Sequence, residues 1–242
     1  MSINCTETSI SPLVPRLGFW AAITAFLTFV VYTICFTAIL LSAPLFTWTT
    51  LADYIAYVGE HGGLFRSLAQ FAMLLFGVSF VVLLNSIQEC ANNEQKILIR
   101  ISVGFGLLFA VTVGIHYFTQ LSAVRLNLLG GQTEGLEHFV QANPYSILSA
   151  INMLGWTLFL GLASLFVAPV FSGARLERLI RSAFLLNAFF CLGGGIGYVE
   201  EIEWLVFVTI TIGMGASVLV ATAALAIWFR RGEERLGVVY AV

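Results

Sequence analysis

Apolar residues along the chain form long, nearly unbroken runs that short polar stretches separate. A helix needs about 20 mostly apolar residues to cross the hydrocarbon of a bilayer. Runs of about this length are Leu17–Leu41, Leu64–Ile87, Ile97–Val124, Ser146–Phe171, Ser182–Val199 and Trp204–Phe229. All six lack Asp, Glu and Lys, and none shows the two-residue alternation of a transmembrane β-strand. The pattern predicts an all-α fold, a polytopic membrane helical bundle with six transmembrane helices.

The composition agrees with this prediction and excludes several classes of protein. Of the 242 residues, 59% are hydrophobic and 10% are charged, whereas about 25% are charged in an average soluble domain. So many long apolar runs do not fit a soluble enzyme or a disordered chain. The formal net charge of −2 leaves no basic surface for nucleic acid. We expect the lipid bilayer as partner, with residues 17–229 as the transmembrane domain and residues 1–16 and 230–242 as cytoplasmic tails.

Basic residues are distributed unequally between the two sides of the predicted bundle. Nine of the 11 fall in the tails and in or beside the second and fourth connections, namely Arg16, Lys96, Arg100, Arg175, Arg178, Arg181, Arg230, Arg231 and Arg235. The other two, Arg66 and Arg125, lie at helix ends on the opposite side. Because cytoplasmic segments carry the excess of Lys and Arg, we expect a multi-pass protein of the cell membrane with both termini cytoplasmic. Cys5 and Cys90 then lie in a reducing compartment, and we expect no disulfide.

Two of the predicted outer connections contain more than a linker. Apolar residues in Leu45–Val58 recur at helical spacing, which predicts a short helix in the headgroup region that Gly62–Gly63 ends. In the third connection, Gly130–Gly131 is expected to end the preceding helix. Asn143–Pro144 is expected to provide the N-cap and first residue of the following helix.

Small residues at every fourth position indicate faces where membrane helices approach each other closely. Such positions are Gly106, Ala110 and Gly114 in the third run and Thr209, Gly213, Ser217 and Ala221 in the sixth. The fifth run contains the glycine-rich segment Gly193–Gly197. Two interpretations of this segment are open: close helix approach, or an unwound stretch that lines a transporter-like site.

Polar residues also recur at helical spacing within the apolar runs. Thr112, His116 and Gln120 share one face of the third helix, and Asn187, Tyr198 and Glu201 share one face of the fifth. Polar groups inside a membrane point inward or at water. These residues are therefore candidates for a polar cavity that opens outward. The alternative is a dry seam of interhelical hydrogen bonds, each worth about 0.6 kcal/mol.

Trp156 lies inside the fourth run, so its indole N–H needs a hydrogen-bond acceptor. Asn152, one turn away, or a group on a neighbouring helix is expected to provide it.

The sequence lacks the residues that several other functions require. A retinal Schiff base needs an intramembrane lysine, but Lys96 lies in a connection, and a bis-histidine haem needs two intramembrane histidines, but only His116 qualifies. No metal-binding spacing occurs, so we expect no catalytic residue, cofactor or metal.

Several short segments of the chain contain packing-type motifs. They are Asp53-Tyr54-Ile55 with the second run through Asn85, Leu154-Gly155-Trp156, Ala168-Pro169-Val170-Phe171 and Leu176-Glu177-Arg178-Leu179-Ile180-Arg181. In these segments the chain resembles a loosely defined group of small, uncharacterised six-helix bacterial membrane proteins. The resemblance spans most of the chain and implies a six-helix fold. It brings no activity, ligand or site.

Two functional hypotheses follow. The first is a non-enzymatic bundle that acts as an accessory or assembly subunit and docks on itself or on another membrane protein. The alternative is a permease or small-solute binding protein that uses the outward-facing polar cavity. The first hypothesis is favoured because the runs show neither broken helices nor intramembrane charge.

Overall fold

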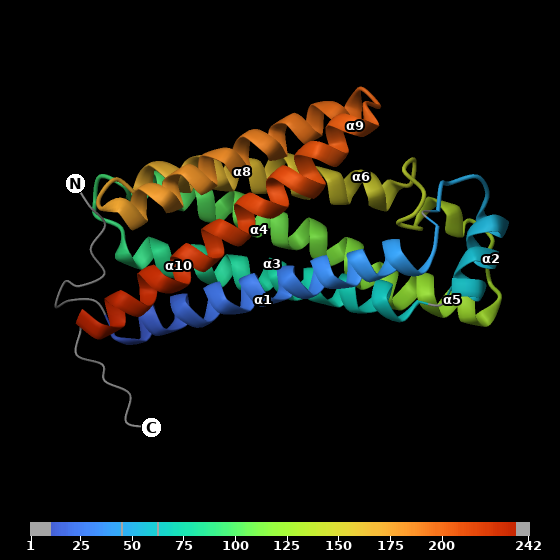
Figure 1. Cartoon of the computed structure of the whole chain (residues 1–242), viewed down its shortest axis with the longest axis horizontal. Coiled ribbons are helices and arrows are strands. Elements are labelled where there is room, and N and C mark those ends of the chain that lie inside the picture. Colours follow the sequence, from blue (N-terminus) through green and yellow to red (C-terminus); the bar gives the residue numbers. More distant parts are fainter. Residues whose placement is uncertain (1–10, 45, 62, 236–242) are drawn as a thin grey trace.

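The computed structural model describes residues 11–235 apart from residues 45 and 62. This part of the chain is an all-α bundle without strands (Figure 1). Six helices are long and apolar enough to span a membrane. They are α1 (Leu13–Ser42); α3 (Leu64–Cys90); α4 (Lys96–Thr119) continued by η1 (Gln120–Val124) and α5 (Arg125–Gly130); α6 (Ile147–Leu154) continued by η3 (Gly155–Phe159), α7 (Leu160–Val167) and η4 (Ala168–Val170); α8 (Arg175–Val199); and α9 (Glu203–Val206) continued by η5 (Phe207–Met214) and α10 (Gly215–Arg235). The predicted fold class is confirmed, and the chain is a multi-pass membrane protein.

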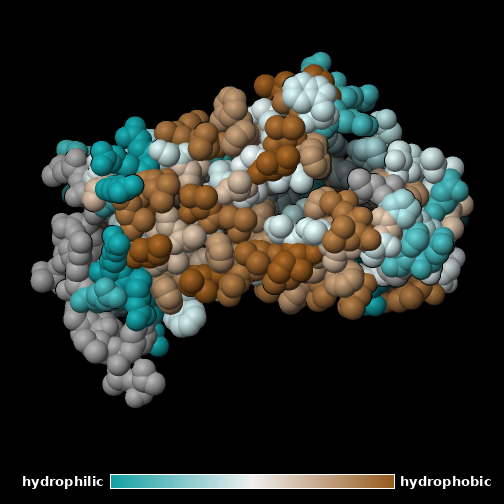
Figure 2. All heavy atoms as spheres, viewed as in Figure 1, coloured by the Kyte–Doolittle hydropathy of each residue, from teal (hydrophilic) through white to brown (hydrophobic). Residues whose placement is uncertain are grey.

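The two ends of the bundle are built differently. At one end, here called the terminal end, α1 begins and α10 finishes (Figure 1). At the other, here called the cap end, α2 (Leu51–His61) and the connection 131–146, which includes η2 (Leu136–His138), cover the helices. Figure 2 shows hydrophilic residues gathered at both ends and a hydrophobic surface between them. This distribution is the one expected of a bundle that lies in a bilayer.

The fifth and sixth spans are longer at the terminal end than the apolar runs predict. α8 begins at Arg175, about two turns before Ser182, and α10 continues beyond Phe229 to Arg235. In the added turns of α8, Ile180 is buried whereas the three arginines are exposed. An amphipathic helix continues past the hydrocarbon when one of its faces still packs on the protein. The predicted limit at residue 182 is therefore wrong.

Cys90, the last residue of α3 at the terminal end, is disulfide-bonded. The other described cysteines, Cys35 and Cys191, are free. The expectation of a chain without disulfides is therefore wrong. Disulfides persist in oxidising compartments, whereas the basic residues of the same end favour the cytoplasm, so these two features of the terminal end favour opposite orientations.

Aromatic rings fill the centre of the bundle. Phe76 on α3 and Phe109 on α4 are fully buried. Trp156 of η3 stacks on Phe76 with ring centroids 5.8 Å apart and meets Phe109 edge-on at 4.9 Å. Phe29 of α1 adds an edge-on contact with Phe76 at 5.6 Å. Such pairs contribute about 0.5–1.5 kcal/mol each beyond burial, and here they join the first four spans.

Glycines lie where two helices touch, as the small-residue pattern predicts. A Cβ atom at Gly106 would clash with the side chain of Leu84, and one at Gly213 would clash with the ring of Phe190. Gly114 is different, because a Cβ atom there would lie 4.0 Å from the nearest side chain, which is ordinary contact. The close approach on α4 is therefore centred on Gly106 and not on Gly114.

The glycine-rich segment Gly193–Gly197 is helical, since α8 is continuous from Arg175 to Val199. A Cβ atom at Gly194 would clash with Ile210, and one at Gly195 would lie 3.1 Å from Thr157. The segment thus allows α8 to approach η5 on one side and η3 on the other. Of the two interpretations, close helix approach is confirmed and an unwound stretch is excluded.

The helix predicted within Leu45–Val58 is present as α2. It ends at His61; Gly62 lies outside the described residues, and Gly63 is the N-cap of α3. Tyr54 is the buried residue of α2, and it belongs to a second, small apolar cluster that also contains Val124, Leu136 and Val140. α2 therefore packs on η1 and the connection 131–146.

The third connection confirms one predicted boundary and corrects another. α5 ends at Gly130, and Gly131 has a φ of 70°, a left-handed conformation that favours glycine. The N-cap of α6 is Ser146, whose hydroxyl accepts a hydrogen bond from the backbone N–H of Ser149 at 3.1 Å. The prediction of an N-cap at Asn143–Pro144 is wrong, because the side-chain oxygen of Asn143 accepts from the N–H of Tyr145 in a turn before the helix.

Three spans contain π-helical segments, and each lies in the part of its span nearer the cap end. They are η1, η3 and η5. Longer π-helical segments are rare, and single π-turns are frequent at functional sites. The apolar runs contain no signal for them, so the cap-end half of the bundle is less regular than the sequence predicts.

Candidate functional site

Thr112, His116 and Gln120 lie on one face of α4 and η1, as their spacing predicts. The Thr112 hydroxyl donates to carbonyl oxygens of its own helix, and it would lie 2.5 Å from a Cβ atom at Gly155, so it faces η3. His116 and Gln120 are buried. All three side chains point toward the fourth span or the connection that precedes it.

The imidazole of His116 is held by a backbone carbonyl. Its Nδ1 lies 2.9 Å from the carbonyl oxygen of Leu148. That oxygen can only accept, so Nδ1 donates and Nε2 carries the lone pair. Nε2 is buried and has no hydrogen-bond partner among the described residues, although the side chain of Gln141 lies beside the ring. Nε2 of His116 is therefore a buried hydrogen-bond acceptor without a donor among the described residues.

Three glutamines fix the connection 131–146 to the helices beneath it. Gln70 of α3 donates from Nε2 to Oε1 of Gln141 at 2.8 Å. Gln120 of η1 donates to the carbonyl oxygen of Phe139, and its Oε1 accepts from the backbone N–H of Gln141 at 3.1 Å. Gln141 is thus held through both its side chain and its backbone.

Two hydroxyl groups fasten the same connection from α6 and α8. The Ser149 hydroxyl donates to the carbonyl oxygen of Asn143 at 2.9 Å. The Tyr198 hydroxyl donates to the carbonyl oxygen of Pro144, also at 2.9 Å. We call the group formed by Gln70, His116, Gln120, Gln141, Ser149 and Tyr198 the cap-end network. It ties one connection to four of the spans.

Asn187 belongs to a separate polar seam in the interior. Its Oδ1 accepts from the Ser164 hydroxyl at 2.8 Å, and its Nδ2 donates to the Ser217 hydroxyl at 3.1 Å and to the Met214 carbonyl at 3.3 Å. The Cys191 thiol also donates to Oδ1 at 3.5 Å. These bonds join α7, α8, η5 and α10 in what we call the Asn187 seam.

Glu201 lies apart from both groups. It is exposed in the turn between α8 and α9, with a φ of 55°. Of the six residues predicted for a cavity, His116, Gln120 and Tyr198 therefore belong to the cap-end network, whereas Thr112 faces η3, and Asn187 and Glu201 lie elsewhere. Gln141 and Ser149 were missed by the sequence analysis, because their partners are backbone atoms or lie far away in the chain.

Trp156 has both of the acceptors that the sequence allows. Its Nε1 donates to Oδ1 of Asn152 at 3.1 Å and to the hydroxyl of Tyr117 on α4 at 3.3 Å. This prediction is confirmed. The shared N–H brings the polar ends of three residues together at the edge of the aromatic core.

A cationic side chain supports α2 at the cap end. Arg66 of α3 donates to the hydroxyl of Tyr54 at 3.0 Å, and its guanidinium lies over the rings of Tyr54 and Tyr57, 5.4 and 5.8 Å from their centroids. Burial raises the pKa of the Tyr54 phenol, and the neighbouring Arg66 partly opposes that shift. Arg66 therefore holds α2 in place by cation–π contact and hydrogen bonding.

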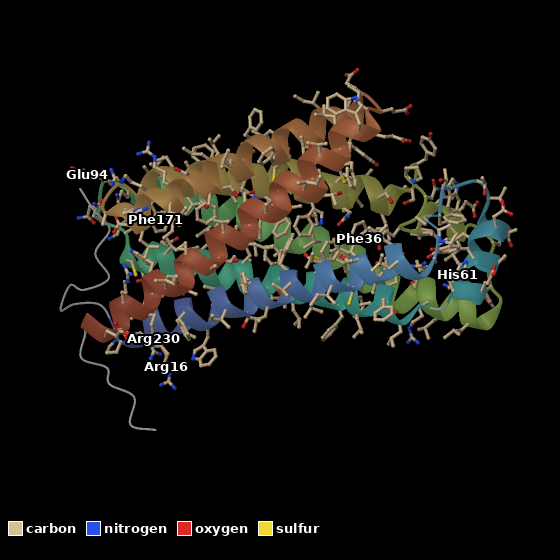
Figure 3. All side chains as sticks on the ribbon, in the orientation of Figure 1. Arg16, Phe36, His61, Glu94, Phe171 and Arg230 are labelled. Carbon is tan, nitrogen blue, oxygen red and sulfur yellow. The ribbon has the colours of Figure 1, made fainter. Side chains whose placement is uncertain are left out.

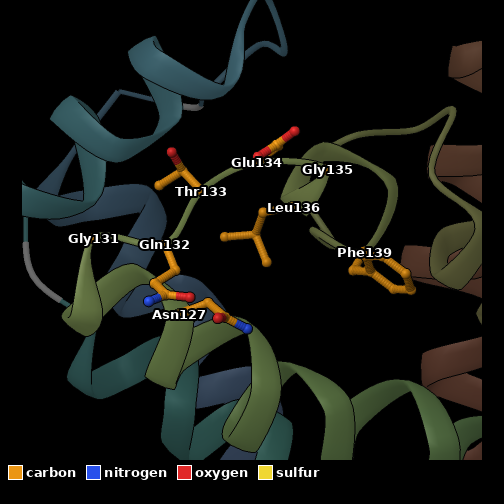
Figure 4. Close-up of a pocket in the computed structure, with 8 residues that line it drawn as sticks. All are labelled: Asn127, Gly131, Gln132, Thr133, Glu134, Gly135, Leu136 and Phe139. Atoms are coloured by element: carbon orange, nitrogen blue, oxygen red, sulfur yellow. The ribbon is translucent and has the colours of Figure 1, made fainter.

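An open recess of about 710 Å³ lies at the surface of the cap end (Figure 4). It is lined by Asn127, Gly131, Gln132, Thr133, Glu134, Gly135, Leu136 and Phe139. None of the six residues predicted for a cavity is among them. The recess is therefore separate from the buried face of α4.

Among the described residues, histidine and carboxylate side chains meet at the surface only as sequence neighbours. His61 lies 3.9 Å from Glu60, and His138 lies 3.7 Å from Glu137. Within the described ranges, no group of three or more His, Cys, Asp and Glu side chains is placed to hold a metal ion. In Figure 3, His61 lies at the opposite end of the bundle from Arg16 and Arg230.

Comparisons of the chain with protein-family models, with curated proteins and with solved structures found no match. Fold and side-chain geometry together define the class. The chain is a six-helix polytopic membrane protein with a polar cap at one end.

Proposed function

We propose that this protein is a non-enzymatic membrane bundle that acts as an accessory or assembly subunit. The observation that carries the proposal is that the polar side chains of the Asn187 seam, and most of those in the cap-end network, are bonded to the fold itself. Asn187 binds three neighbouring helical segments, and the cap-end network binds the connection 131–146. Polar groups that are satisfied within a protein rigidify it, which suits a scaffold better than a transport path.

The lateral surface supports the same proposal. Only 22% of the most apolar stretch of α1 is buried, against 56% for α3. α1 therefore has a wide apolar face that another membrane protein could cover. A photoreactive residue at Ile34, which is 61% exposed on α1, is expected to yield one discrete protein adduct in cells. Phe189 on α8, 69% exposed, is the matched position, and lipid adducts alone at both positions would contradict the docking role.

A thiol-labelling experiment tests whether the interior is closed. Cysteine replaces His116 or Gln120 after Cys35 and Cys191 have been changed to Ala, and a membrane-impermeant reagent is added from the cap side. The control is Glu134→Cys, at an exposed position that lines the recess of Figure 4. We expect labelling at position 134 and none at 116 or 120, in variants whose thermal unfolding in detergent shows that they are folded.

The second candidate is a permease or small-solute binding protein. The unpartnered Nε2 of His116 favours it, because a buried acceptor without a partner is costly unless a ligand or water fills the site. Rapid labelling at position 116 or 120 would support this candidate and contradict the closed scaffold.

We propose that this is a protein of the cell membrane and that both of its termini lie in the cytoplasm, because cytoplasmic segments carry the excess of basic residues. Reporter fusions after Lys96 and Arg181 are expected to read cytoplasmic, and fusions after Gly63 and Gln141 are expected to read exported. The disulfide of Cys90 makes this test informative. If the fusions after Lys96 and Arg181 were exported, the terminal end would face outward and the proposed orientation would be wrong.

A further inference from the structure

A groove of about 610 Å³ runs along the side of the bundle between the fourth and fifth spans. Its lining includes Ala150, Thr157, Leu192, Gly195, Tyr198 and Glu200. Except for Glu200, these residues belong to helices long and apolar enough to span the membrane. The groove therefore opens to lipid hydrocarbon over most of its length.

The groove offers almost only apolar contacts to an occupant. Ala150 and Gly195 have small side chains or none, and the hydroxyl of Thr157 already donates to the carbonyl oxygen of Met153 at 2.6 Å. The Tyr198 hydroxyl is likewise used by Pro144. A polar ligand would leave its own groups unpaired there, whereas a hydrocarbon chain would not.

The mouth of the groove is acidic. Glu200 lines it, and Glu201 and Glu203 follow at the exposed tip of the α8–α9 hairpin. None of the three forms an ion pair with a described basic residue. An anionic headgroup would be repelled at this position, while an ammonium group could donate charge-assisted hydrogen bonds to the Glu200 carboxylate.

The length of the groove suits an acyl chain. Eight residues of helical rise separate Leu192 from Glu200, which is about 12 Å. An extended acyl chain can lie along this distance, with its polar end beside Glu200 at the mouth of the groove.

We infer that this groove binds one acyl chain of a phospholipid whose headgroup carries a primary amine, with the ammonium group at Glu200. The binding lies in the leaflet at the cap end, whichever compartment that end faces. It does not depend on the proposed accessory role, because lipid binding and subunit docking use different surfaces.

Lipid selectivity tests the headgroup. The full-length protein is reconstituted with equal amounts of phosphatidylethanolamine, phosphatidylcholine and phosphatidylglycerol with identical chains, and the retained lipid is measured by native mass spectrometry. We expect retention in that order, with phosphatidylethanolamine favoured about fivefold over phosphatidylglycerol, the size of one exposed charge interaction. Glu200→Gln is expected to abolish the preference, while Glu60→Gln on α2, a matched exposed carboxylate, leaves it unchanged.

Photocrosslinking tests the position of the chain. Phosphatidylethanolamine with a diazirine in one acyl chain is expected to label peptides that contain residues 150–158 and 192–200. Ala150→Phe fills the groove and is expected to reduce this labelling several-fold, whereas Ala216→Phe, at an exposed alanine of α10, is not. Equal retention of all three lipids, a preference that survives Glu200→Gln, or labelling spread evenly over the lipid-facing surface would each overturn the inference.

Discussion

The Asn187 seam and the cap-end network are both polar clusters, but they are built from different partners. Asn187 bonds with two serine hydroxyls and one carbonyl, all on neighbouring helical segments. His116 and Gln120 bond with backbone groups of Leu148, Phe139 and Gln141, which lie in or beside a connection. The first cluster joins helices to helices, and the second joins helices to a loop.

The difference shows what each cluster contributes. In the Asn187 seam, the oxygen and the nitrogen of the amide both have partners, so the seam has no capacity for a ligand. In the cap-end network, the Nε2 of His116 has none. Local unfolding is expected to expose the cap-end network before the Asn187 seam, because loops open at lower free energy than packed helices.

The largest effect is expected from overpacking beside the Asn187 seam. Gly213→Leu places a side chain against the ring of Phe190, where even a Cβ atom would clash. We expect a loss of about 1–3 kcal/mol in the free energy of unfolding, measured by denaturing-detergent titration. Gly114→Leu is the matched control, since that site has room for a Cβ atom. Equal losses in both variants would contradict the assigned helix contact.

The next effect is expected at the cap-end network. His116→Leu removes the hydrogen bond that the imidazole donates to the Leu148 carbonyl, with an expected loss of about 1–1.5 kcal/mol in the free energy of unfolding. The change should also speed proteolytic cleavage within residues 131–146, which the network holds. His116→Gln, which keeps a donor, should recover part of both effects. Unfolding without faster cleavage would show that His116 does not hold the connection.

A smaller effect is expected at the Asn187 seam itself. Asn187→Leu should lower the free energy of unfolding by about 1 kcal/mol, because interhelical hydrogen bonds in membranes average about 0.6 kcal/mol each. Ser164→Ala should lower the free energy of unfolding less in the Asn187→Leu background than in the native chain. Cleavage within residues 131–146 should not change, and faster cleavage would show that the two clusters are coupled.

The smallest effect is expected from pH at α2. Burial raises the pKa of Tyr54 above its ordinary value of 10.0, so its contribution to stability is complete below that pH. As the pH rises above about 10, the unfolded phenol ionises first and the folded cap loses stability. Ultraviolet titration and proteolysis of α2 should show this loss, and Tyr54→Phe should remove it. A phenol that titrates at its ordinary pKa would show that Tyr54 is not buried.

The sequence predicts some of the side-chain contacts at the cap end and misses others. The spacing of Thr112, His116 and Gln120 correctly places them on one face, and Trp156 does bond with Asn152. The backbone acceptors of His116 and Gln120 could not be predicted, because they depend on how the connection 131–146 folds back. Ser146 rather than Asn143 caps α6 for the same reason, since either residue type is suitable there.

The sequence by itself determined the six membrane spans, since a long, mostly apolar run matches the hydrocarbon and can satisfy its backbone hydrogen bonds there as a helix. It also determined which faces carry small or polar residues, because the helical period is fixed. The tertiary structure alone decided that Gly106 and not Gly114 touches its neighbour, and that Asn187 and His116 belong to separate clusters. Those outcomes depend on the rotation and tilt of whole helices and on loop folding, which arise from many weak contacts between residues far apart in the chain.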